Sequence, residues 1–151
     1  MALTRANIET ILVKRTSKLM VFVGMDGTTV DGTNADLDDP IGVAIRDCGG
    51  SVDNFTDVDD DDITTVDSAK YDQLIDIAEY RLLNSILGNF DKYGLKVGPR
   101  SGYQSQVREG VEVRLKQMRK DLEAKYGYNA PTPSVGYIER DFAEHNEDLP
   151  S

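Results

Sequence analysis

The chain has 151 residues, of which 39% are hydrophobic and 29% are charged, and its formal net charge is −10. This length and balance predict one globular domain with a core of its own. No apolar run approaches the roughly 20 residues that span a bilayer, so we expect no membrane partner and an intracellular protein. With one cysteine, Cys48, and one histidine, His145, the chain has too few ligands for an intrachain disulfide or a Cys/His zinc cluster. We expect Cys48 to be a small buried residue and His145 to be exposed.

The acidic residues are concentrated in one block of the sequence. Residues 21–67 hold thirteen aspartates against the single cation Arg46, which gives a net charge of −12. Residues 1–20 and 91–126 are instead basic, with net charges of +3 and +4. This separation argues against whole-surface binding to a polyanion but permits local contact, and it supplies opposite charges for charge-matched neighbours.

The first half of the chain predicts two helices separated by a loop. Thr4 is a suitable N-cap for a helix over residues 5–20, whose apolar positions include Ile8 and Leu12. The glycine-rich residues that follow contain two Asp-Gly pairs and allow a short β-hairpin near residues 21–30. A short helix over 40–48 then has Asp39 as its cap, Pro40 at its first position, and Gly49-Gly50 as its stop.

The second half predicts two long amphipathic helices. Apolar residues recur every three or four positions over 68–90, and this helix is expected to be the core element. Residues 91–102 hold three glycines and a proline and are expected to form a loop. A second stripe predicts a helix over 103–126 that Gly127 ends. Its members are Val107, Val111, Leu115, Met118, Leu122 and Tyr126.

The C-terminal residues have no helical period and contain Pro131, Pro133 and Pro150. They predict an extended tail with separate apolar anchors. We therefore expect a helical domain over 1–127 and a tail over 128–151. The sequence leaves two uses for the anchors: contact with a partner, or packing of the tail onto its own domain.

The stretch "NFTDVDDDDITTVDSAKYDQL" holds six aspartates between Asp57 and Asp67 and raises the question of a calcium site. An EF-hand loop needs glycine at its sixth position and a bidentate glutamate at its twelfth. Counted from Asp57, these positions are Asp62 and Ser68. The pattern therefore favours a solvated loop and helix start, with Asp67 or Ser68 as N-cap, over a metal site.

The sequence lacks the common catalytic motifs: it has no Gly-x-Ser-x-Gly, no phosphate-binding Gly-x-x-x-x-Gly-Lys-Ser/Thr and no Gly-x-Gly-x-x-Gly. We expect a protein that is not an enzyme and that uses neither a cofactor nor a metal. Cations on the helix 103–126 alternate with glutamates and aspartates and indicate a solvated face. Few acidic residues lie near three other cations in the sequence, Lys92, Lys96 and Arg100. These three are our candidates for contact with DNA phosphates.

The order of the elements over residues 3–126 resembles the head-tail connector (adaptor) proteins of tailed bacteriophages. The residues that carry this likeness are the short helix "DDPIGVAIRDCGG", the Asp-rich connection, and the long segments "AKYDQLIDIAEYRLLNSILGNF" and "YQSQVREGVEVRLKQMRKDLEAKYGY". The glycine-rich insertion over 21–36 is longer than that family's helical pattern requires.

The resemblance implies an all-α subunit of a dodecameric ring in the virion neck, made in the host cytoplasm. Such a ring binds the portal protein on one side and a downstream neck or tail protein on the other. It extends the channel through which double-stranded DNA passes, with transient, non-specific contact. The resemblance also suggests which residues make these contacts. The residues expected to dock on the portal are Tyr128, Tyr137, Ile138 and Phe142. The residues expected to face the channel are Lys92, Lys96 and Arg100.

The acidic block favours a different class, an acidic protein that mimics DNA and inhibits a nucleic-acid enzyme. The basic helices and the apolar anchors of the tail do not fit that class. The sequence therefore leaves two hypotheses, of which the connector explains more of its features.

Overall fold

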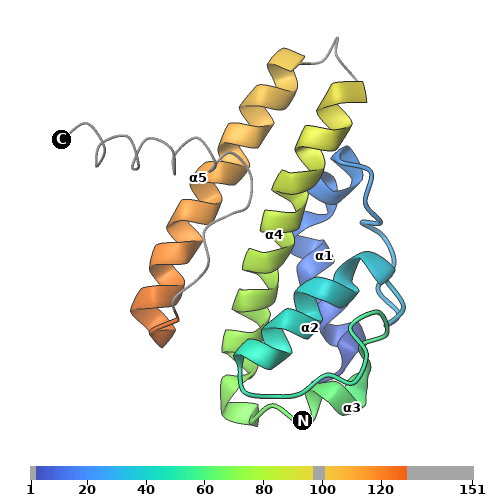
Figure 1. The fold of residues 1–151 in the computed structure, drawn as a ribbon, viewed down its shortest axis with the longest axis vertical. Helices are drawn as coiled ribbons and strands as arrows, with labels where there is room; N and C mark the ends of the chain where they lie inside the picture. The colour runs from blue at the N-terminus through green and yellow to red at the C-terminus, as the bar shows by residue number, and fades with distance from the viewer. Residues whose placement is uncertain (1–2, 97–100, 129–151) are drawn as a thin grey trace, which may run out of the picture.

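The computed structural model describes residues 3–96 and 101–128, and the side chains of residues 3–90 and 106–128. These residues form α-helices and short 3-10 turns and contain no strand (Figure 1). The predicted all-α class is confirmed. The elements, in chain order, are α1 (Arg5–Phe22), η1 (Ala35–Leu37), α2 (Asp38–Asp47), α3 (Asp60–Ile63), η2 (Ser68–Lys70), α4 (Tyr71–Lys96) and α5 (Ser101–Tyr126).

Several helix ends lie where the sequence predicts them. Thr4 caps α1: its hydroxyl accepts a hydrogen bond from the Asn7 amide, and the Asn7 side chain accepts one from the Thr4 amide. Gly49 ends α2 with a φ of 91°, a conformation that a residue with a Cβ rarely adopts. The amides of Gly49 and Gly50 then bond back to the carbonyls of Arg46 and Ile45 and satisfy the last turn of the helix.

The predicted hairpin near residues 21–30 is not formed. Val21 and Phe22 remain in α1, so no first strand exists. The Asp26 carboxylate instead accepts hydrogen bonds from the amides of Thr28 and Thr29 and holds the following residues in a side-chain-capped turn. The side-chain hydrogen bond with Thr29, together with these two amide bonds, lowers the pKa of Asp26 to about 2. The Asp-Gly signal indicates a turn correctly, but the turn does not join two strands.

Three other boundaries differ from the prediction. α2 begins at Asp38, because η1 leads directly into it and neither Asp39 nor Pro40 occupies the start. α3 forms inside the Asp-rich stretch, where a loop was expected, and Asp59 and Asp62 cap it reciprocally. α4 continues to Lys96 rather than ending at residue 90.

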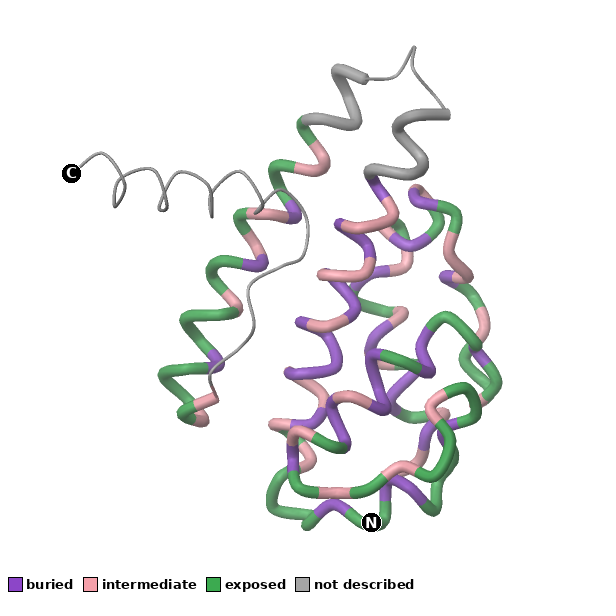
Figure 2. Tube along the Cα trace, in the orientation of Figure 1, coloured by how far each residue is buried: buried purple, intermediate pink, exposed green. Residues whose placement is uncertain are grey.

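α4 is the central helix of the fold. It packs against α1 and α2 on one side and against α5 on the other (Figures 1 and 2). Most of the predicted stripe is buried, and two of its members, Tyr71 and Ile75, are only half-buried. The buried members are Leu74, Ala78, Leu82, Ile86 and Phe90. Because α4 has neighbours on two sides, a second set of its residues is also buried. This set is Ile77, Tyr80, Leu83 and Leu87.

α5 runs antiparallel to α4 and has one apolar side (Figure 1). The predicted stripe is confirmed: Val111, Leu115 and Leu122 are buried, and Val107, Met118 and Tyr126 are partly buried against the core. Its principal contact is α4. Over residues 106–126, most residues on the opposite side of α5 are exposed (Figure 2).

Candidate functional site

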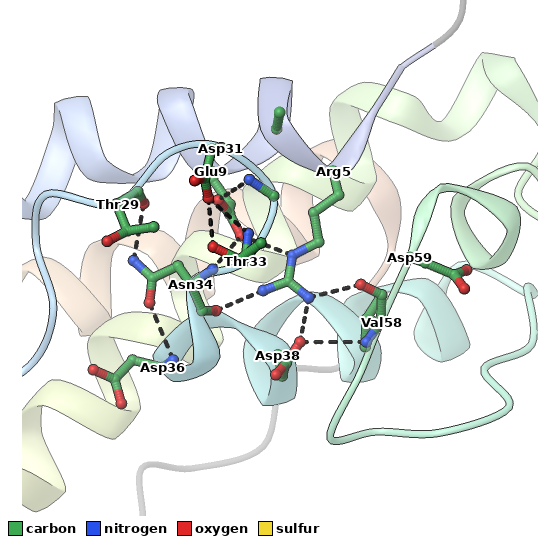
Figure 3. Close-up of polar contacts among 12 residues, drawn as sticks. Arg5, Glu9, Thr29, Asp31, Thr33, Asn34, Asp36, Asp38, Val58 and Asp59 are labelled. Carbon is green, nitrogen blue, oxygen red and sulfur yellow. Dashed lines mark hydrogen bonds and ion pairs between the residues drawn. The ribbon is translucent and has the colours of Figure 1, made fainter.

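A buried ionic cluster at the start of α1 organises the acidic loops (Figure 3). Arg5 is only 3% exposed, and its guanidinium contacts the carboxylates of Glu9 and Asp38. It also donates to two loop carbonyls, that of Asn34 at 2.5 Å and that of Val58 at 2.7 Å. One side chain therefore connects α1, α2 and both loops, and its charge offsets part of the surrounding acid.

Glu9 and Asn34 fix the glycine-rich loop to α1. The Glu9 carboxylate is fully buried and accepts hydrogen bonds from the amides of Gly32, at 2.8 Å, and Asn34, at 3.1 Å. The Asn34 side chain donates to the carbonyls of Asp26 and Thr29. These bonds satisfy amides and carbonyls of the loop, which would be costly to bury without a partner.

Most of the aspartates between residues 26 and 67 have a local structural role. Nine of the thirteen accept a hydrogen bond or ion pair from the domain itself, as turn formers, helix caps or partners of arginine. They are Asp26, Asp31, Asp36, Asp38, Asp47, Asp59, Asp60, Asp62 and Asp67. The Asp-rich stretch is therefore more ordered than a plain solvated loop.

A hollow of about 350 Å³ lies between the start of α1 and the two acidic loops. Its carboxylates come from Asp31, Asp57, Asp59, Asp60 and Asp61. Within the described residues, no group of three or more carboxylate, imidazole or thiol side chains is placed to hold a metal ion. The arrangement thus gives no support to a calcium site.

A second ionic cluster joins the three long helices. Glu79 of α4 is 7% exposed and accepts hydrogen bonds from Arg15 of α1 and from Arg114 of α5, each at 2.6 Å. Nearby, the Tyr126 hydroxyl donates to Asp76 at 2.7 Å. These contacts fix the rotation of α5 about its own axis, which the apolar stripe alone leaves less defined.

Tyr128 folds back onto the domain instead of starting a free tail. Its hydroxyl donates to Asp47 at 2.6 Å and accepts from Arg81 at 3.2 Å, so it connects α5 to α2 and α4. Gly127, with a φ of 66°, reverses the chain to make this contact. Burial and the bond to Asp47 raise the pKa of the Tyr128 hydroxyl to about 12. The described fold therefore extends to residue 128, and Tyr128, predicted to dock on the portal, has its hydroxyl bonded within the domain.

The remaining predicted site residues are only partly placed by the structure. Lys92 and Lys96 lie in the last turns of α4, not in a loop, because the helix runs on to Lys96. Arg100, Tyr137, Ile138, Phe142 and His145 lie outside the described residues. Cys48 is 3% exposed, as predicted, and burial raises the pKa of its thiol to about 11. A thiol that stays protonated and buried is a core residue rather than a nucleophile.

Comparison with protein-family models, curated proteins and solved structures finds no match. Among the helices of the described part, none is both long and apolar enough to cross a membrane.

Charge is arranged on two sides of α4. Most of the exposed aspartates lie in the segments beside α1 and α2. On α5, Lys116, Arg119 and Lys120 are exposed, as are the acidic residues Glu109, Asp121 and Glu123. α5 lies across α4 from α1 and α2, so the Asp-rich segments and the three cations of α5 lie on opposite sides of α4 (Figure 1). α1 also exposes Lys14 and Lys18 on the side of the aspartates.

Proposed function

We propose that this protein is a subunit of a head-tail connector ring of a tailed bacteriophage. The ring sits between the portal and the tail and extends the DNA channel. The observation that carries the proposal is that most exposed aspartates lie beside α1 and α2, across α4 from the exposed cations Lys116, Arg119 and Lys120. A closed ring is built from head-to-tail contacts, and these need two different, complementary surfaces on every subunit.

The helical hairpin supports the same proposal. α4 is covered on both sides, whereas α5 has one covered side and one open side. A helix of 26 residues is about 39 Å long, so its open side is a large surface for a neighbouring subunit. The resemblance adds the copy number, a dodecamer, and the location in the virion neck.

The channel role is assigned to the end of the α4–α5 hairpin. Lys92 and Lys96 fall on the last turns of α4, and Arg100 precedes α5 in the sequence. Repeated around a ring, these cations would attract phosphates in a sequence-independent manner. Replacing all three by glutamine is expected to change DNA retention in the particle without preventing assembly. Unchanged retention would remove this role.

Docking on the portal is assigned to the C-terminal segment through Tyr137, Ile138 and Phe142. The test is a pair of chains, the full protein and one ending at Tyr128, each sedimented with the portal protein. The truncated chain keeps the Tyr128 contacts with Asp47 and Arg81, so its domain should stay folded. We expect it to lose portal binding. Equal binding by the two chains would place the portal contact on the helices.

The hydrogen bonding of the aspartates favours the connector over a DNA mimic. A mimic needs carboxylates displayed in a row at phosphate-like spacing, and these carboxylates are spread over turns, caps and a buried cluster. A pull-down with a basic nuclease separates the classes. Tight, stoichiometric capture of the nuclease would favour the mimic.

A further inference from the structure

The open side of α5 carries a cationic ridge, defined here as Lys116, Arg119 and Lys120. All three are exposed and lie within about one turn of each other: Lys116 and Lys120 lie away from the buried stripe, and Arg119 borders it. Two acidic residues of the same helix, Asp121 and Glu123, are also exposed beside them. None of them forms an ion pair with any residue in the described part of the chain. Val113 lies one turn before Lys116 and is 67% exposed, which adds an apolar contact point to the same side.

The acidic hollow on the other side of α4 has the opposite charge. Of its five aspartates, Asp57 and Asp61 accept no hydrogen bond through their side chains from the described residues. Arg5 also lines the hollow, but Glu9, Asp38 and two carbonyls already use its guanidinium. The described part of the domain therefore leaves the charge of Asp57 and Asp61 unmatched, and it shows no metal-binding arrangement that would match it.

We propose that the cationic ridge of one copy docks against the acidic hollow of the next copy. The inference rests on the proposed function and names the contact that builds the ring. The two surfaces lie on opposite sides of α4, so the contact is head-to-tail. A copy that binds through its ridge leaves its hollow free for the next copy, and a copy that binds through its hollow leaves its ridge free. Pairing of exposed charges makes such a contact fast to form and sensitive to salt.

The test exchanges the charges of the two surfaces. The ridge variant carries Lys116→Glu and Lys120→Glu, and the hollow variant carries Asp57→Lys and Asp61→Lys. Each variant has like charges on both surfaces, so each alone should associate about tenfold more weakly than the parent, or worse, in low salt. A mixture of the two restores opposite charges at the contact between a ridge variant and a hollow variant and should recover association. Sedimentation velocity measures the association, and circular dichroism checks that both variants are folded.

A matched control alters the same amount of charge elsewhere. Lys14 and Lys18 are exposed on α1 and lie outside the ridge, so Lys14→Glu with Lys18→Glu should leave association within about twofold of the parent. If the ridge and hollow variants still associate normally, or if their mixture fails to recover, the docking contact is wrong while the ring itself stands. If the parent stays monomeric alone and with portal, both the contact and the ring proposal fall.

Discussion

Arg5 and its partners determine how the acidic loops sit on the domain. A positive charge that is almost fully buried contacts two carboxylates and two carbonyls contributed by α1, α2 and both loops. Buried ion pairs contribute little net stability compared with apolar residues of the same shape, but removing one member leaves a charge without compensation. The cluster therefore determines which arrangement the loops adopt more than it adds to the net stability of the domain.

Arg5→Ala should be among the most damaging single substitutions in the described part of the chain. It leaves Glu9 and Asp38 buried without their cation, and we expect a loss of about 3–5 kcal/mol in the free energy of unfolding. Arg15→Ala is the control, because the Arg15 side chain is 43% exposed and its loss should cost about 1 kcal/mol or less. Urea denaturation measures both. Equal effects would show that burial of the Arg5 cluster is not the deciding factor.

Tyr128 gives the domain a measurable dependence on alkaline pH. The pKa of its hydroxyl rises from 10.0 to about 12 on folding, so the folded state holds a proton that the unfolded state releases. The stability from this contact is complete below pH 10 and is lost as the pH rises toward 12. Tyr126, bonded to Asp76, has a pKa raised in the same way to about 12.

Tyr128→Phe should therefore cost about 1 kcal/mol at pH 7 and flatten the alkaline loss of stability. Urea denaturation of both proteins at several pH values across this window measures the effect. Parallel curves for the parent and the variant above the ordinary tyrosine pKa would mean that the hydroxyl is not bonded to Asp47 in solution.

Residue patterns could predict the caps but not the buried polar clusters. Thr4 and Asp67 cap helices through bonds to amides within three residues, so the local sequence contains the information. Arg5 and Glu9 form an i,i+4 pair that is typical of a solvated helix face, and only distant loops bury it. The one local signal is an ionic pair on the apolar side, next to Ile8 and Leu12.

Two glycine substitutions, one at a helix end and one inside a helix, test the assigned helix boundaries. Gly49→Ala places a Cβ at a φ of 91° and should destabilise the protein by about 1–2 kcal/mol. Gly110 lies in α5, and a methyl group added there would meet open space, so Gly110→Ala should stabilise by about 0.5–1 kcal/mol. Thermal unfolding of both variants measures the two shifts. Shifts of the same sign would contradict the assigned helix ends.

The Asp-rich stretch around α3 should not respond to calcium. Asp59 and Asp62 use their carboxylates to cap α3, and the described residues contain no metal-binding group of three ligands. Adding millimolar calcium should leave the melting temperature of the parent unchanged, as it should for a variant with Asp57, Asp59 and Asp61 replaced by asparagine. A calcium-dependent rise in the parent that the variant lacks would reveal a site.

The sequence predicts where the long helices lie better than it predicts which sides of each helix are covered by other helices. The stripe of α5 is predictable in full because α5 has one covered side. α4 is covered on two sides, so its second buried set, including Tyr80 and Leu83, does not follow from one stripe. α3 is a four-residue helix whose apolar content, Ile63 alone, carries no period.

At the scale of the molecule, the described residues place the Asp-rich loops and α5 on opposite sides of the central helix α4 (Figure 1). Net charge alone, at −10, indicates only an acidic protein. The sequence already separates the charges along the chain, and the placement of the helices puts the Asp-rich segments and the cations of α5 on different sides of α4, which suits repeated head-to-tail contact.

Electron microscopy of the full chain mixed with the portal protein of the same phage tests the connector proposal most directly. The proposal predicts a closed ring of this protein, stacked coaxially on the portal and continuing its channel. Portal particles without added density, under conditions in which both proteins are folded, would contradict it.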